Sequence, residues 1–250
     1  MIKLTRRDEP EVLIDNKAEW LAALRAAIEK YGSYAKIPEA EKAALTANYR
    51  HQDIKDALIE SSFGKCAFCE CIPAEGGNVE VEHFNPKSIY PDLTFEWLNF
   101  LPSCRKCNGS KLSHDTGSEP IINPYDYNPD TLFFYDGLQL KVLETPDRLV
   151  GLKTIEVCGL NTVRLWRPRA DILVSLYCFA GSLEEALADF KDADTKRKRI
   201  NRFRRISEAV DQIELLASEK EKYSFFCLSF LKECIPYAEA KKILREGVLD

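Results

Sequence analysis

Apolar residues in the first sixty positions recur every three or four residues, the period of a helix with one buried face. This pattern predicts a first helix that begins near Asn16 and ends at Gly32. Its apolar positions are Trp20, Leu21, Leu24 and Ile28. Pro38 stands where a second helix would begin, and a third helix is expected to end before Phe63.

The helical period is lost between residues 65 and 118. Residues 79–83 alternate between apolar and polar side chains, which predicts a short strand. Further on, residues 131–135 and 138–142 are expected to pair as a hairpin, because Asp136–Gly137 between them is a typical two-residue turn. This middle part of the chain is therefore predicted to mix short strands and loops.

Helical periodicity returns after Pro146 and continues to the end of the chain. Breaks are expected at Gly159, Pro168 and Pro236, and the capping box that starts at Ser182 predicts a new helix there. The fold class is thus mostly α with a small α+β insert. Three regions follow: an N-terminal helical region 1–63, the insert 64–118, and a hairpin with a C-terminal helical region 119–250 that could bind a partner.

Composition places the chain among ordinary globular proteins. The 250 residues include 35 Lys and Arg against 40 Asp and Glu, a net charge of −5, which excludes a uniformly basic nucleic-acid coat. The N-terminus does not resemble a signal peptide, and the apolar runs are too short for a membrane span. A cytoplasmic protein with reduced thiols and no membrane partner is expected.

Nine cysteines cannot all pair in disulfides within one chain. Two Cys-x-x-Cys pairs, separated by 34 residues that run from Glu70 to Ser103, can present four thiolates to Zn²⁺ in a tetrahedron. The predicted ligands are Cys66, Cys69, Cys104 and Cys107. Four thiolates close the coordination sphere, so this zinc is expected to be structural. Cys71 remains an alternative ligand to Cys69.

Four more cysteines lie in apolar helical contexts and are expected to fill cores. They are Cys158, Cys178, Cys227 and Cys234.

Side chains suited to phosphodiester hydrolysis lie between and just after the two pairs. His83 could serve as a general base, while Glu82 and Asn108 offer oxygen ligands to a hard cation such as Mg²⁺ or Mn²⁺. Lys111, one helical turn beyond Asn108, could approach a phosphate. Because no Ser–His–Asp arrangement is evident, this set favours metal-assisted phosphodiester cleavage over acyl transfer.

From Cys66 to Lys111 the chain resembles the HNH endonucleases, which have a ββα-metal fold. The matching positions are Glu82, His83, Pro86, Asn99, Asn108, Gly109 and Lys111. The resemblance implies that Asn99 braces the loop that carries His83 and that Glu82 and Asn108 hold the catalytic ion. Glu82 departs from the commoner Asp, and its extra methylene could loosen the metal geometry.

A wider resemblance includes the opening Met1 to Leu4, the Glu82–Lys87 core and the long helical tail. In these features the chain is similar to the HNH subunits of Septu-type anti-phage defence systems. That resemblance implies DNA as the substrate and an ABC-type ATPase subunit as the partner. Two alternatives stay open: a non-catalytic, zinc-stapled module for DNA binding or assembly, and a free-standing restriction-type HNH nuclease.

Cations near the motif are expected to contact DNA, namely Lys87, Arg105, Lys106 and Lys111. A second basic run extends from Lys196 to Arg205 and holds seven cations without an acid. It could contact phosphates, in which case binding would depend strongly on salt. It could equally be a solvated helix face or pair with an acidic partner surface.

Overall fold

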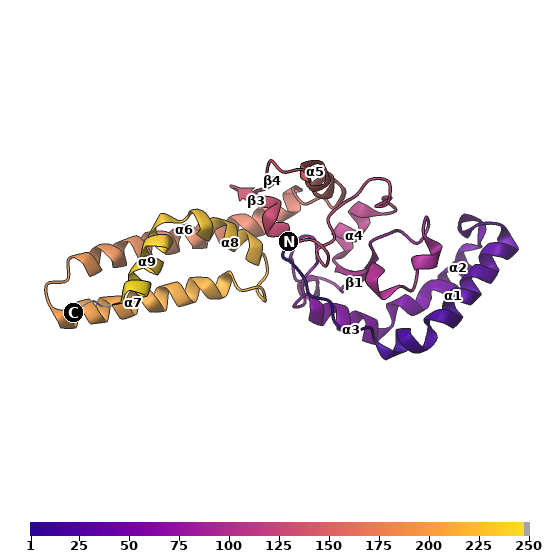
Figure 1. Cartoon of the computed structure of the whole chain (residues 1–250), viewed down its shortest axis with the longest axis horizontal. Coiled ribbons are helices and arrows are strands. Elements are labelled where there is room, and N and C mark those ends of the chain that lie inside the picture. The colour runs from indigo at the N-terminus through magenta and orange to yellow at the C-terminus, as the bar shows by residue number, and fades with distance from the viewer. Residues whose placement is uncertain (248–250) are drawn as a thin grey trace. The chain divides into compact units, whose positions relative to one another are not determined.

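The computed structural model describes residues 1–247, and the chain divides into two units (Figure 1). Unit 1 comprises Met1–Phe133 and Val142–Asn161, and unit 2 comprises Phe134–Lys141 and the chain from Thr162 onward. The chain is mainly helical, with two small two-stranded sheets, in agreement with the predicted class. The N-terminal helical region and the insert lie together in unit 1.

Three helices form the N-terminal part of unit 1: α1 (Glu11–Tyr31), α2 (Glu39–Thr46) and α3 (Gln52–Ser61). The start of α1 was predicted wrongly. The helix begins directly after Pro10, and Asn16 lies inside it, where its amide donates to the Val12 carbonyl instead of capping. The predicted end is confirmed, because Gly32 adopts the left-handed conformation (φ +81°) that terminates a helix.

The predicted strand at residues 79–83 is confirmed as β1 (Glu80–His83). It pairs in antiparallel fashion with β2 (Phe100–Ser103), with Glu80 opposite Ser103 and His83 opposite Phe100. Helix α4 (Arg105–Lys111) follows β2 almost at once. The polypeptide order in this part of unit 1 is therefore strand, strand, helix.

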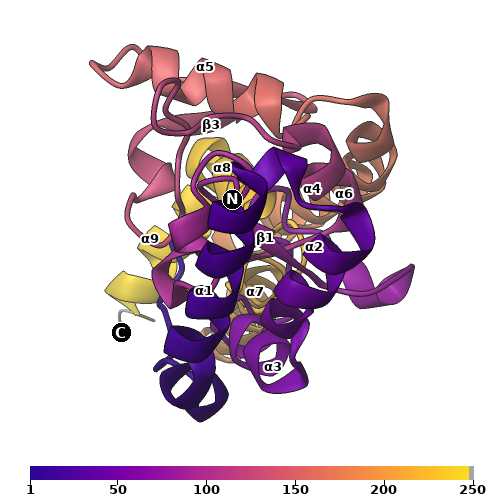
Figure 2. The same ribbon diagram turned by 90° about the vertical axis from the view of Figure 1, so that its right-hand side faces the viewer.

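One face of the β1–β2 hairpin belongs to the main core of unit 1. Val81 and Phe100 pack there with buried residues of α1 and α3, among them Leu24 and Leu58. Figure 2 looks onto the side of this unit that α1 and α2 form. Since side chains alternate along a strand, Glu80 and Glu82 point to the other face.

The second predicted hairpin is also confirmed, as β3 (Phe133–Asp136) and β4 (Gln139–Val142). Gly137 has a φ of +55°, which its turn requires and which glycine adopts without strain. Helix α5 (Arg148–Val157) follows in unit 1, where the Thr154 hydroxyl accepts a hydrogen bond from the backbone amide of Ile122.

Unit 2 contains α6 (Val163–Lys191), α7 (Lys196–Leu216), α8 (Ser224–Glu233) and α9 (Ile235–Glu246). Helices α6, α7 and α9 share an apolar core, which includes Leu187, Val210 and Ala240. The break before Pro236 is confirmed, since α8 ends and α9 begins around Cys234.

Two predictions for α6 were wrong. Neither Pro168 nor the capping box at Ser182 interrupts this helix, and the Ser182 hydroxyl donates to the Cys178 carbonyl one turn earlier. Cys178 is exposed and fills no core, because it lies on the solvent side of α6. The other three helical cysteines are buried as predicted.

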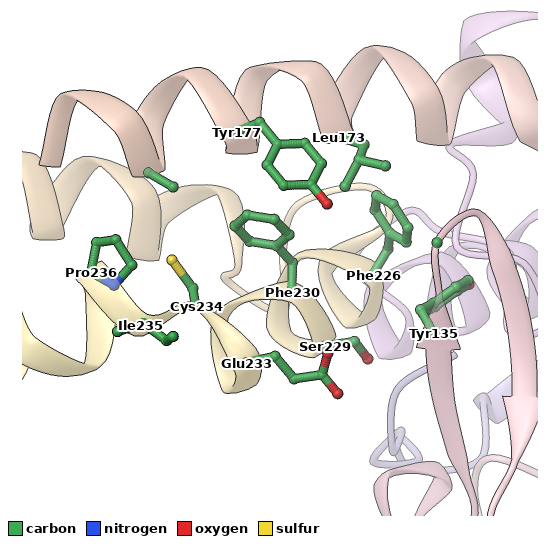
Figure 3. A pocket seen from close by; sticks show the side chains of 12 residues that line it. Tyr135, Leu173, Tyr177, Phe226, Ser229, Phe230, Glu233, Cys234, Ile235 and Pro236 are labelled. Carbon is green, nitrogen blue, oxygen red and sulfur yellow. The ribbon is translucent and has the colours of Figure 1, made fainter. Parts of the chain in front are cut away.

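An apolar hollow of about 340 Å³ lies within unit 2 (Figure 3). Leu173 and Tyr177 of α6 face Phe226 and Phe230 of α8 across it, and the rings of Tyr177 and Phe230 meet edge to face at 5.3 Å. Of the helices within residues 1–247, none is both long and apolar enough to cross a membrane.

Candidate metal centre and active site

The four predicted cysteines come together at the open end of the β1–β2 hairpin. Their sulfur atoms all lie within 4.8 Å of one another, and all four side chains are buried. The Sγ atoms of Cys69 and Cys104 are 3.8 Å apart, close to the ~3.8 Å edge of a tetrahedron with Zn–S bonds of about 2.3 Å. This cluster could hold a metal such as zinc, because soft thiolates without water access suit that ion.

Cys71 is the neighbour of this cluster but not a member of it. Its Sγ lies 3.4 Å from that of Cys69, and its side chain is half-exposed. In the second pair, the Cys104 sulfur accepts a hydrogen bond from the Cys107 backbone amide at 3.4 Å. Such amide–sulfur contacts orient a thiolate and stabilise its charge.

A buried ionic group supports the first cysteine pair. Glu70, between Cys69 and Cys71, has a φ of +61° and is only 2% exposed. Its carboxylate meets the N-terminal amine of Met1 at 2.8 Å and the Lys65 ammonium at 3.4 Å. Because a buried carboxylate is costly without cationic partners, these contacts hold the turn in its unusual conformation.

Two carboxylates on β1 face α4. The Glu80 carboxylate accepts a hydrogen bond from the Asn108 side-chain amide at 2.6 Å. The Glu82 carboxylate forms an ion pair with the Lys111 ammonium at 2.7 Å, and Lys111 also donates to the His83 carbonyl at 2.9 Å. Glu80 and Glu82 are two residues apart on the strand, and Asn108 and Lys111 are three residues apart on the helix. The Glu80–Asn108 and Glu82–Lys111 pairs therefore lie side by side.

Glu82 is held away from water. It is 3% exposed, and this burial raises the pKa of its carboxyl to about 7, although Lys111 acts in the opposite direction. Glu80 is half-exposed by comparison. The charge of Glu82 therefore varies near neutral pH.

His83 lies on the opposite face of β1, at its end. Its Nε2 is 2.9 Å from the carbonyl oxygen of Thr94, so that nitrogen carries the proton and donates it, while Nδ1 is left as the basic atom. The rings of Tyr49 and Phe100 meet the imidazole edge to face, with centroids 4.6 and 5.2 Å away. These contacts fix both the tautomer and the orientation of the ring.

Cations around His83 keep it neutral. Burial lowers the pKa of the imidazole to about 3, and Lys87, Lys111 and Arg50 add to this effect. The Lys87 ammonium lies over the Tyr49 ring at 5.2 Å. At neutral pH the imidazole is consequently neutral, and the cations around it would attract an anion.

Asn99 braces the backbone that follows His83. Its side-chain oxygen accepts from the Asn85 amide at 2.7 Å, and its amide nitrogen donates to the carbonyls of Asn85 and Leu93 at 3.0 Å each. Arg6 fixes the turn that carries Asn99, since it donates to the carbonyls of Trp97 and Leu98. An N-terminal segment far away in sequence therefore supports this position.

The structure pairs Glu82 with Lys111 and Asn108 with Glu80, while His83 lies on the opposite face of β1. Lys111 is buried against Glu82, whereas Arg105 and Lys106 are exposed on the outer side of α4. Sequence reasoning missed Glu80, Tyr49 and Arg50 as neighbours. Glu80 could have been found from its spacing of two before Glu82, but nothing in the sequence brings Tyr49 and Arg50 to the strand.

The raised pKa of Glu82 predicts a specific dependence of stability on pH. Between its ordinary value near 4.5 and about 7 the folded chain binds more protons than the unfolded one. The free energy of unfolding should therefore fall as pH rises from 6 to 7, by at most about 1.4 kcal/mol per pH unit, and then level off. Glu82→Gln should remove this slope in urea denaturation, whereas exposed Glu19→Gln should preserve it. Equal slopes in all three proteins would contradict the assignment.

Comparison with known proteins gives relatives over most of the chain. It is 36% identical to the Septu protein PtuB of Bacillus thuringiensis over 193 residues, which span 76% of this chain and 73% of that protein. It is 27% identical to the Septu protein PtuB of Bacillus mycoides, over 69% of this chain and 67% of the relative.

A third similarity is local. Protein ea31 of Escherichia phage lambda is 40% identical over 73 residues, which make up 28% of this chain and 24% of that protein. No protein-family model matches the chain. The two longer alignments each cover about two thirds or more of both chains. The chain therefore belongs to the PtuB family of Septu proteins.

Proposed function

We propose that the protein is a metal-dependent HNH endonuclease that hydrolyses phosphodiester bonds in DNA. The observation that carries the proposal is the setting of His83, whose Nε2 is anchored on the Thr94 carbonyl while Asn99 braces the adjoining loop. The order β1, β2, α4 next to a four-cysteine cluster agrees with the ββα-metal core that the HNH resemblance implies.

In this proposal His83 is the general base. Its Nδ1 takes a proton from water, and the resulting hydroxide attacks the phosphorus in line with the bond to be broken. The P–O3′ bond then breaks, and the 3′-oxygen leaves and takes up a proton from solvent. Since His83 is neutral at physiological pH, it is available to accept the proton without prior deprotonation.

Oxygen donors on β1 and α4 would suit a hard divalent cation. Glu82 and Asn108 would hold Mg²⁺ or Mn²⁺, which prefer carboxylate and amide oxygens. Such an ion would supply positive charge next to the phosphate that is cleaved. Lys111 positions the Glu82 carboxylate through their 2.7 Å ion pair, and Asn99 positions the His83 loop.

We also propose that the four-cysteine cluster binds zinc, which would cross-link the two ends of the segment that contains His83. The donor set consists of sulfur only, whereas the proposed catalytic site offers oxygen and nitrogen. Each ion therefore has its own site, and removal of zinc would act through the fold.

The names of the two relatives, together with the resemblance to Septu nuclease subunits, support a role in anti-phage defence. In this role an ABC-type ATPase subunit would hold and restrain the nuclease, and Lys87, Arg105 and Lys106 would contact DNA. A free-standing, restriction-type nuclease is the alternative.

One observation favours a non-catalytic DNA-binding or assembly module. His83 is only 5% exposed, so little of it is accessible to water or substrate. A purely structural histidine would show the same burial. Activity of His83 variants separates the two proposals.

Replacement of the proposed base should abolish most cleavage. His83→Ala is expected to slow plasmid nicking by about 10²- to 10⁴-fold in the presence of Mg²⁺ or Mn²⁺, with an unchanged circular dichroism spectrum. His51→Asn is the control, because His51 is exposed and caps α3, a role that asparagine also fills. Full cleavage by the His83 variant would rule out the assignment.

Loss of one cluster thiol should act on stability. Wild-type protein should contain about one zinc ion per chain, and Cys107→Ser should lower both the zinc content and the melting temperature, the latter by roughly 10 °C or more. The matched control is exposed Cys178→Ser, which should leave both unchanged. Purified wild-type protein without zinc would overturn this part of the proposal.

A defence complex should survive purification. Chain isolated from its native cells is expected to carry a stoichiometric ATPase subunit, identified by mass spectrometry. Cleavage assays with and without that subunit then measure its restraint on the nuclease. An active chain that purifies alone under the same conditions would favour the free-standing alternative.

A further inference from the structure

A cavity of about 330 Å³ adjoins the candidate active site within unit 1. Its polar lining comes from Tyr49, Arg50, Lys55, Asn78, Glu80 and Asn108. The first three residues lie outside the HNH-like segment, at the start of α3 and just before it. The cavity therefore joins the N-terminal helical region to the face of β1 that carries the carboxylates.

Cations occupy one side of this cavity. Arg50 lies with its guanidinium 4.9 Å from the centre of the Tyr49 ring, and its Nε donates to the Tyr49 hydroxyl at 3.1 Å. This leaves the two terminal nitrogens of Arg50 for an external acceptor. Within residues 1–247 neither Arg50 nor Lys55 forms a salt bridge with a carboxylate.

One residue of the cavity lining, Tyr49, contacts the proposed base. The ring of Tyr49 contacts the His83 imidazole with centroids 4.6 Å apart, and on the other side Glu80 and Asn108 are joined at 2.6 Å. An anion between Arg50 and Lys55 would therefore lie in the same cavity as the Tyr49 ring, which packs on His83, and as Glu80 and Asn108, which offer oxygen donors for a cation.

We infer that this cavity receives the sugar–phosphate backbone of the DNA strand to be cut, with Arg50 and Lys55 as its phosphate ligands. The inference rests on the proposed function and extends it to residues outside the motif. A guanidinium with two free nitrogens matches phosphate oxygens in a bidentate manner, and a lysine adds a point charge. Charge complementarity thus identifies a phosphodiester as the occupant.

The basic run on α7 is a weaker candidate for this role. Lys198 pairs with Asp194 at 2.8 Å, and Arg204 pairs with Glu208 at 3.5 Å, so part of its charge is already neutralised. The cavity cations lack such partners, and the charge of Arg50 acts on the proposed base. This comparison selects Arg50 and Lys55 as the residues to test.

The test measures DNA binding by the full chain with the His83→Ala change, which prevents cleavage during the measurement. Fluorescence anisotropy of a labelled duplex is followed over a range of salt concentrations. Adding Arg50→Gln and Lys55→Gln should lower the slope of log affinity against log salt by about 2, since each phosphate contact contributes about 0.9. Affinity at about 0.1 M salt should fall at least tenfold.

Two matched variants separate phosphate binding from loss of structure. Arg7→Gln with Lys36→Gln removes the same charge from exposed positions outside the cavity lining, and it should leave the slope unchanged. Arg50→Lys with Lys55→Arg preserves the charge and should restore most of the slope. Failure of this pair to restore it would show that the effect was structural and would overturn the inference.

An unchanged slope in the Arg50→Gln/Lys55→Gln protein would also overturn it. Such a result would leave the proposed nuclease intact, because plasmid cleavage by the wild type and its loss in His83→Ala are measured separately. A wild-type chain that neither binds nor cuts DNA would instead contradict the proposed function itself.

Discussion

A metal held by the four buried thiols would tie together the two ends of the candidate site. Strands β1 and β2 have four residues each, and a hairpin of that length has little stability by itself. The clustered sulfur atoms join the chain before β1 to the turn that follows β2. A metal bound there would fix the register between Glu80–His83 and the start of α4, on which the Glu80–Asn108 and Glu82–Lys111 pairs depend.

Much of this arrangement is predictable from short-range sequence signals. Cysteine spacing identifies the cluster, and alternation identifies β1, because both depend on residues close together in the chain. The start of α1 and the continuity of α6 were missed, since isolated signals at Asn16 and Ser182 were outweighed by the surrounding helix. Tyr49 and Arg50 could not be predicted beside His83, because tertiary packing alone brings them there.

Opposite charges are distributed unevenly around β1. One face carries two carboxylates that meet an amide and a buried ammonium, and the other carries a neutral imidazole near Lys87 and Arg50. Burial raises the pKa of the Glu82 carboxyl and lowers that of the His83 imidazole, so the two groups change their charge at different pH values. A phosphate and a divalent cation would each find groups of complementary charge within this small region.

The contacts made by Arg6 affect how the protein can be divided. Arg6 donates to the carbonyls of the turn that presents Asn99, and the Trp97 indole donates to the Arg7 carbonyl. A fragment cut at the borders of the HNH-like segment would lose these bonds together with Tyr49. Transplantation of residues 64–118 into another scaffold would therefore transfer the cysteines and the histidine without the framework that orients them. In engineering terms, the smallest portable unit includes the first helices as well.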